Sequence, residues 1–272
     1  MKNSLYIKSV YFILIFIISA CEEITEYNFK STANGKLAVE AFITDEDKIQ
    51  EVKLTLSYDT LNAKPLPATG AVVVIRTEND VFSFSEDLSQ PGLFKSDYKF
   101  SAKLNKEYIL EIKWKDKVYT AYNEMIQVLP FTPVTFKLIN NSTDTLTFDQ
   151  TPQGFSPHEM AMYELLVDWN EIQPNIKNKS KYLYFTFNTL DVSEIFTPTK
   201  EIPKFPKGSR VIERKYSLNS QAAKYFRSIL LETEWQGGIF DEASSIITGN
   251  ISNDGLGYFC VCSVLSDTLI AK

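Results

Sequence analysis

Histidine and cysteine are scarce in this sequence: His158 is the only histidine, and Cys21, Cys260 and Cys262 are the only cysteines. A lone histidine excludes a metal site with two histidine ligands, and the zinc pattern H-E-x-x-H is absent. The glycine-rich phosphate loops G-x-G-x-x-G and G-x-x-x-x-G-K are absent too, so nucleotide binding has no support. We therefore predict no catalytic residues, no metal site and no cofactor.

Positive charge and long apolar runs are also in short supply. The chain has 28 Lys and Arg against 34 Asp and Glu, a formal net charge of -6. An acidic chain without a basic block argues against a nucleic-acid partner. What the chain does have is 13% aromatic and 44% hydrophobic residues, which indicates a folded, β-rich body rather than disorder.

The first 20 residues have the pattern of a secretory signal peptide. Lys2 and Lys8 flank a polar start, and Val10–Ala20 is almost wholly apolar. As a helix this apolar stretch covers about 16 Å, roughly half of the hydrocarbon core of a bilayer. Small residues directly before Cys21 resemble a bacterial lipobox. We predict that residues 1–20 are removed and that Cys21 carries lipid chains such as palmitate; the alternative is an ordinary transmembrane anchor.

Residues 21–35 are polar and predict a lipidated tether that leads into the fold. Glu22 and Glu23 follow the cysteine at once, with Glu26 close behind. This acidic cluster resembles the export signal that carries lipoproteins of Bacteroidota to the outer face of the outer membrane. The alternative is a solvated, charged tether without a sorting role.

Strand signals recur between residues 36 and 130. Val52, Leu54 and Leu56 alternate with polar neighbours, the pattern of a half-buried strand. The strands that we predict cover residues 36–44, 50–58, 71–77, 81–85, 107–114 and 118–122. Six or more short strands at this spacing predict an immunoglobulin-like β-sandwich over residues 36–130, without a cysteine pair to staple it.

Pro130 and Pro133 mark the best domain boundary. Residues 131–272 predict a second β-rich domain with one packed helix near 218–235, which Ser217 or Asn219 caps and Gly237–Gly238 ends. The strands that we predict here cover residues 134–139, 160–169, 182–188 and 257–265. The fold class is therefore mainly β.

Cys260 and Cys262 lie two residues apart in the last predicted strand, so both point to the same face. A disulfide between them would be strained, because alternate residues of a strand lie near the upper limit of Cα separation for a bridge. We predict two packed free thiols; the alternative is a redox or metal pair.

Two further features have both a structural and a functional reading. The aromatic row at Tyr182, Tyr184, Phe185 and Phe187 predicts core packing on both faces of a strand, with a sugar or peptide platform as the alternative. His158 could belong to a Ser-His-Asp triad, but G-x-S-x-G is missing. A pair of carboxylates could also act as in a glycosidase, although nothing singles out two of them.

Three Asp-Thr-Leu tripeptides place threonines at predicted strand ends or in loops. The pattern resembles the acceptor site for O-glycosylation of exported proteins in Bacteroidota. The candidate acceptors are Thr60, Thr145 and Thr268. The alternative is coincidence, because each residue type is common in this chain.

Several segments together resemble the family catalogued as domain of unknown function 4249. They are residues 37–45, 70–74, 91–94, 108–112, 237–252 and 257–259. The chain departs from the family pattern at Cys260 and Cys262, where small residues are more usual, and at Asn105–Lys106, where a glycine turn is typical. The resemblance implies a lipoprotein of Bacteroidota that assists a TonB-dependent outer-membrane transporter.

We therefore expect a non-enzymatic lipoprotein anchored to the outer membrane, facing the cell surface, that captures a ligand for such a transporter or caps its barrel. The ligand could be a small molecule, a peptide or a glycan. An adhesion or matrix-binding module without a transporter partner is the main alternative, since an immunoglobulin-like domain suits it equally well. A hydrolase that uses carboxylates ranks last.

Overall fold

The computed structural model describes residues 35–58, 63–140, 142–156, 159–174, 178–189, 195, 200–235 and 247–272. Residues 33–272 form one compact unit. Strands dominate the described part of the chain, which confirms the mainly β fold class.

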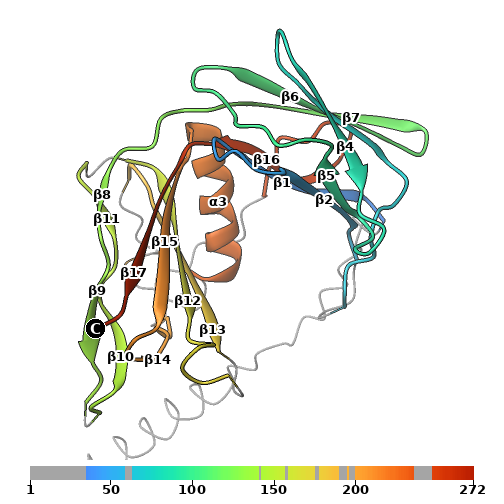
Figure 1. The fold of residues 1–272 in the computed structure, drawn as a ribbon. Coiled ribbons are helices and arrows are strands. Elements are labelled where there is room, and N and C mark those ends of the chain that lie inside the picture. Colours follow the sequence, from blue (N-terminus) through green and yellow to red (C-terminus); the bar gives the residue numbers. More distant parts are fainter. Residues whose placement is uncertain are drawn as a thin grey trace, which may run out of the picture. The chain divides into compact units, whose positions relative to one another are not determined.

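The first half of the chain builds most of an eight-stranded sheet (Figure 1). Its strand order is β16-β1-β2-β5-β4-β3-β6-β7. The strands are β1 (Leu37–Thr44), β2 (Glu51–Leu56), β3 (Val72–Arg76), β4 (Val81–Glu86), β5 (Leu93–Ser96), β6 (Glu107–Trp114), β7 (Lys117–Glu124) and β16 (Leu256–Cys262). In β2 the exposed Glu51 and Lys53 alternate with the buried Val52 and Leu54, as the sequence predicts.

This sheet folds over onto itself into a β-sandwich. Its two ends meet, because the backbone N–H of Val261 in β16 donates to Oδ1 of Asn123 in β7 at 3.0 Å. The inward-facing side chains form one core, in which Phe82 stacks on Phe100 with ring centroids 3.9 Å apart. Fully buried members include Leu37, Ile43, Leu54, Phe94, Leu110, Ile112 and Phe259.

β16 comes from the far end of the chain, which the sequence does not reveal. It pairs with β1 in parallel over seven residue pairs, from Ala38–Leu256 to Thr44–Cys262. The predicted boundary near Pro130 falls where the chain leaves this sheet after β7, but the sheet gains β16 from the second half. After Ser263 the chain runs straight into β17 (Val264–Ile270), which belongs to another sheet.

The second half is centred on a four-stranded antiparallel sheet of order β13-β12-β15-β17. Its other strands are β12 (Ala161–Asp168), β13 (Lys179–Thr186) and β15 (Arg210–Ser217). A small sheet of β14 (Phe205–Pro206), β10 (Thr145–Gln150) and β9 (Thr135–Leu138) packs on one face, and β11 (Gln153–Gly154) pairs with β8 (Phe131–Thr132). The opposite face packs against a helix and β16.

That helix, α3 (Ser220–Thr233), confirms the predicted helix near 218–235. Asn219 is its N-cap, and the Asn219 side chain accepts a hydrogen bond from Ala222 N at 2.9 Å. The glycines expected to end the helix lie outside the described residues. Among those residues, no helix is both long and apolar enough to cross a membrane.

Hydrogen bonds fix the two sheets to each other around Ser263. The Asp45 carboxylate, just after β1, accepts from the Ser263 hydroxyl at 2.6 Å and from Val264 N at 2.9 Å. The Ser217 hydroxyl donates to the carbonyl of Ile126 at 2.8 Å. These contacts hold the chain in place where it passes from β16 to β17. The bonds to Asp45 are the stronger ones, because a charged acceptor strengthens a hydrogen bond.

β17 is an edge strand, and carboxylates accept hydrogen bonds from two of its backbone N–H groups. In the described part of the chain it pairs only with β15. The Asp45 carboxylate accepts a hydrogen bond from the backbone N–H of Val264, and the Asp267 carboxylate accepts one from the backbone N–H of Thr268 at 2.7 Å. Carboxylates on an edge oppose pairing with a strand of another chain.

Lys215 of β15 is fully buried and holds the link between the two halves. Its ammonium group donates to the carbonyls of Leu129 and Pro130 at 2.9 and 3.3 Å. It also forms an ion pair with Glu159 at 2.6 Å. A buried ammonium group with three acceptors is fully satisfied, so this contact sets the path of the linker.

We expect Lys215→Met to lower the free energy of unfolding by about 3–5 kcal/mol, because Glu159 would keep a buried charge without its partner. Chemical denaturation followed by circular dichroism measures this change. Lys224→Met, on the exposed side of α3, is the matched control and should shift stability by under about 0.5 kcal/mol. Equal effects of the two variants would contradict the role given to Lys215.

Candidate functional site

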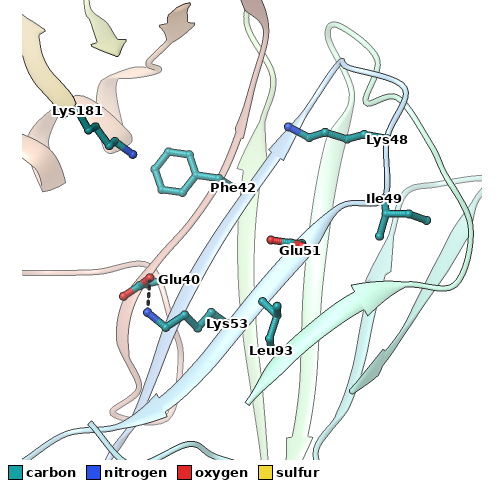
Figure 2. A pocket seen from close by; sticks show the side chains of 8 residues that line it. All are labelled: Glu40, Phe42, Lys48, Ile49, Glu51, Lys53, Leu93 and Lys181. Atoms are coloured by element: carbon teal, nitrogen blue, oxygen red, sulfur yellow. Dashed lines mark hydrogen bonds and ion pairs between the residues drawn. The ribbon is translucent and has the colours of Figure 1, made fainter. Parts of the chain in front are cut away.

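A groove with a volume of about 630 Å³ lies over the outer face of the β-sandwich. We call it the charged groove (Figure 2). It is lined by Glu40, Phe42, Lys48, Ile49, Glu51, Lys53, Leu93 and Lys181. Its size falls within the range of sites for small molecules.

Strand alternation presents most of these side chains. In β1 the buried Val39 and Ala41 turn Glu40 and Phe42 outward. Glu40 is the register partner of Lys53 in β2, and their side chains form an ion pair at 3.2 Å. Both charges are at least half exposed, so water screens the pair and it adds little to stability. These residues are therefore available for a ligand.

Lys181 of β13 and an aromatic cluster border the groove from the second half of the chain. The ring of Phe42 lies 5.7 Å from that of Phe226 in α3. Phe226 in turn stacks on Phe185 of β13 at 5.2 Å. The apolar part of the groove is thus continuous with the packing that holds α3 on the sandwich.

A chain of alternating charges connects the two lysines on either side of Phe42. Glu46 pairs with Lys48 at 2.5 Å, and Glu164 pairs with Lys181 at 2.5 Å. Arg214 lies between the two carboxylates, 3.8 Å from Glu46 and 3.9 Å from Glu164. Each charge thus has a neighbour of opposite sign, although water screens the pairs of Lys48 and Lys181, whose side chains are 41% and 54% exposed.

These contacts shift the titration of the groups involved. Burial alone would raise the pKa of Glu46, but the hydrogen bond from Lys48 and the charges of Lys48 and Arg214 outweigh it and lower the pKa. Burial raises the pKa of Tyr216, whose hydroxyl donates to Glu164 at 2.9 Å. At neutral pH Glu46 is a carboxylate, and Tyr216 is a hydrogen-bond donor.

The charged groove can bind a ligand that carries charge and an apolar part. Three lysines and two glutamates line it, and Phe42, Ile49 and Leu93 supply apolar surface. Among the described residues, His, Cys, Asp and Glu form no group of three that could hold a metal ion. The residues present can hold and orient a molecule by charge and contact.

Cys21, Thr60 and His158 lie outside the described residues. Thr145 is half-buried at the start of β10, where its hydroxyl donates to Asp144 at 3.1 Å. Thr268 is exposed on β17, accessible to a modifying enzyme. The structure does not bring these two threonines to the charged groove, and both stay candidate O-glycosylation sites.

The predicted aromatic row packs on both faces of β13. Tyr182 and Tyr184 face the small sheet, and Phe185 and Phe187 face α3. Tyr184 stacks on Tyr163 at 4.7 Å. The core interpretation of this row is therefore confirmed, because neighbouring elements cover both faces of the strand.

Cys260 and Cys262 are free and buried in β16, as the sequence predicts. A hydrogen bond with Cys260 and complete burial raise the pKa of the Cys262 thiol. The thiol of Cys262 is therefore protonated at neutral pH and a poor nucleophile.

Sequence reasoning missed the charged groove. Glu40, Glu51 and Lys53 look like the solvated face of two strands, and only the register of β1 and β2 places them together. Lys181 comes from a strand 128 residues beyond Lys53, and no local pattern connects them. The one sequence feature that could have indicated the groove is the set of charged residues at the outward positions of β1 and β2.

The family model described as "Domain of unknown function (DUF4249)" matches residues 22–268. The chain belongs to this family. The match covers both halves of the DUF4249 chain and confirms the resemblance seen in the sequence. Within this range lie all eight residues that line the charged groove.

No curated protein matches the chain. Among solved structures it is similar to the chicken CNTN1 FN1–FN3 domains, with 12% identity and a TM-score of 0.27. That likeness covers 69% of this chain and 64% of the CNTN1 chain.

We expect Glu46→Gln and Glu213→Gln to change stability in opposite directions. Because the pKa of Glu46 is lowered from 4.5, its stabilisation is present above pH 4.5 and is lost as the pH falls below that value. Burial raises the pKa of Glu213 from 4.5, so its ionisation costs stability as the pH rises.

Thermal unfolding of the two variants between pH 3 and 8 checks this expectation. At pH 7, Glu46→Gln should lower Tm by a few degrees and Glu213→Gln should raise it, because the new amide oxygen still accepts from Val134 N. Below pH 4 both differences should shrink. Shifts of the same sign at pH 7 would refute the assignment.

Proposed function

We propose that this protein is a lipid-anchored, non-enzymatic binding protein of the outer-membrane surface that captures a ligand for a TonB-dependent transporter. The observation that carries the proposal is the charged groove, in which a series of ion pairs connects Lys48, from the loop after β1, with Lys181 of β13. Partners of opposite sign limit the conformations of these side chains, which reduces the side-chain entropy lost on binding.

The position of the groove supports binding rather than a structural role. Its charged side chains point away from the sandwich core, so the fold does not need them for packing. Lys48 and Lys181 lie on opposite sides of Phe42, so that a ligand between them would contact both halves of the chain (Figure 2). Charges of both signs favour a ligand with both acidic and basic groups, such as a peptide.

The proposed anchor rests on the lipobox at Cys21, and the proposed transporter rests on the family resemblance. A lipid anchor of several chains gives stable membrane attachment, which one chain does not. An anchored capture protein next to a transporter raises the local concentration of ligand at its mouth.

Purification from native outer membranes in mild detergent tests the partnership. We expect a TonB-dependent transporter in stoichiometric amount, identified by mass spectrometry. Recovery of the protein alone, from membranes in which other complexes stay intact, would contradict the accessory role and favour adhesion. Cys21→Ala should abolish recovery in the membrane fraction; a variant that stays in that fraction would contradict the lipid anchor.

Charge reversal in the groove tests ligand capture. We expect wild-type protein from native membranes to carry a bound molecule in native mass spectrometry, and Glu51→Lys to lower its occupancy about tenfold, which is ~1.4 kcal/mol. Glu124→Lys is the matched control, because Glu124 is also exposed on a strand of the same sheet but outside the groove. Equal occupancy in the two variants would exclude the charged groove as the ligand site.

A further inference from the structure

One end of the β-sandwich carries exposed leucines on loops that hydrogen bonds hold in place. The side chain of Leu66 is 66% exposed and that of Leu88 is 92% exposed. The Leu66 carbonyl accepts from Leu56 N at 2.8 Å, and Ala68 N donates to Leu54 O at 3.0 Å. Residues 66–68 of the loop before β3 are therefore attached to β2.

Glu86 connects this loop to the loop that carries Leu88. Its carboxylate accepts from Gly70 N at 2.8 Å and from Gly92 N at 2.9 Å. Gly92 has a φ of 83°, and a Cβ there would lie 2.6 Å from the carbonyl oxygen of Leu54. Leu66 and Leu88 thus present apolar side chains to solvent from loops whose backbone is held by hydrogen bonds.

Several lysines lie at the same end of the sandwich as these leucines. The turn between β6 and β7 carries Lys115 and Lys117, both exposed, and Trp114 beside them donates from Nε1 to the carbonyl of Thr69 at 3.2 Å. Lys36 and Lys117 also line a recess of about 420 Å³ at this end. We call the set Lys36, Lys64, Leu66, Leu88, Lys115 and Lys117 the lysine–leucine end.

The charge of this end differs from that of the chain as a whole. Lys36, Lys115 and Lys117 line the recess together with Asp116 and Asp254, and Lys64 is exposed two residues before Leu66. Glu86 accepts from two backbone amides, and Asp87 pairs with Lys95 at 2.7 Å. The described loops and recess of this end thus carry five lysines against four carboxylates. The complete chain carries a net charge of -6. A local excess of lysine in an acidic protein favours an anionic partner.

The chain enters the sandwich at the same end. Gly35 N donates to Ser57 O and Ser57 N donates to Lys36 O, each at 2.9 Å, so β1 begins beside the loop that carries Leu66. Residues 21–34 separate Cys21 from this point. A segment of that length reaches at most about 50 Å when fully extended. A lipid on Cys21 would thus keep this end near the bilayer.

We propose that the lysine–leucine end docks on a lipid surface that bears phosphate groups, which orients the charged groove relative to the membrane. The inference rests on the proposed lipid anchor. Leu66 and Leu88 enter the interface between headgroups and acyl chains, and the four lysines attract the phosphates. Trp114 stays within the sandwich and supports the turn that presents Lys115 and Lys117.

The test uses the full lipidated protein, reconstituted into vesicles of phosphatidylcholine with or without phosphatidylglycerol. An environment-sensitive fluorophore is attached at Leu66→Cys or, as the matched control, at Leu138→Cys in β9. Both leucines are at least half exposed, and the native Cys260 and Cys262 are buried and protected from the reagent. Nitroxide-labelled lipids report the contact of the label with the bilayer.

We expect the lipids to quench the fluorophore at position 66 and not the one at position 138. The quenching at position 66 should be stronger in vesicles with phosphatidylglycerol, and it should be lost in the double variant Lys115→Glu/Lys117→Glu. For the unacylated Cys21→Ser chain, each lysine changed to alanine should lower the partition coefficient about fivefold at low salt. Equal quenching at both positions, or none at 66 in protein that floats with the vesicles, overturns the inference and leaves the anchor standing. Protein that does not float overturns both.

Discussion

The fold depends on the parallel pairing of β1 with β16. Seven residue pairs bring residues 38–44 next to residues 256–262, so the sandwich is complete only when the end of the chain has arrived. The same pairing fixes the second half, because Ser263 follows β16 at once and β17 follows Ser263. Asp45 then bonds Ser263 and Val264 from the end of β1. Contacts so distant in sequence have a high cost in loop-closure entropy, which the large apolar core of the sandwich offsets.

Local patterns in the sequence predicted many of the strands and the helix, but not which strands pair with each other. The alternation in residues 50–58 predicted β2, and the apolar stripe with Asn219 before it predicted α3. β15 was missed because its buried face includes Glu213 and Lys215, charged residues that break the apolar pattern until Val134 N and Glu159 are seen beside them. The residues 257–265 read as one strand, whereas Ser263 divides two sheets there. The charged groove could not be predicted, since it depends on register and on contacts between distant strands.

Charge has a different role in each part of the molecule. Around Lys215 it is buried and fully paired, and it fixes the path of the chain. Between Lys48 and Lys181 it is partly exposed and continuous, so that charged side chains remain open to a ligand. At the loops near Leu66 it is exposed, where its attraction depends on ionic strength. The net charge of the chain conceals these differences, because the lysines are concentrated at particular places on an otherwise acidic protein.

The attachment of β1 also has a mechanical consequence. A pull on the chain before Gly35, applied along β1, reaches that strand at its first residue, Leu37. β1 lies between β2 and β16, and it is hydrogen-bonded to both. Ladder hydrogen bonds run across the strands, so this force loads both ladders in shear, and many bonds must break together rather than one after another. Among the strands of the sandwich, β1 is thus well placed to resist extraction by a pull on the chain before it.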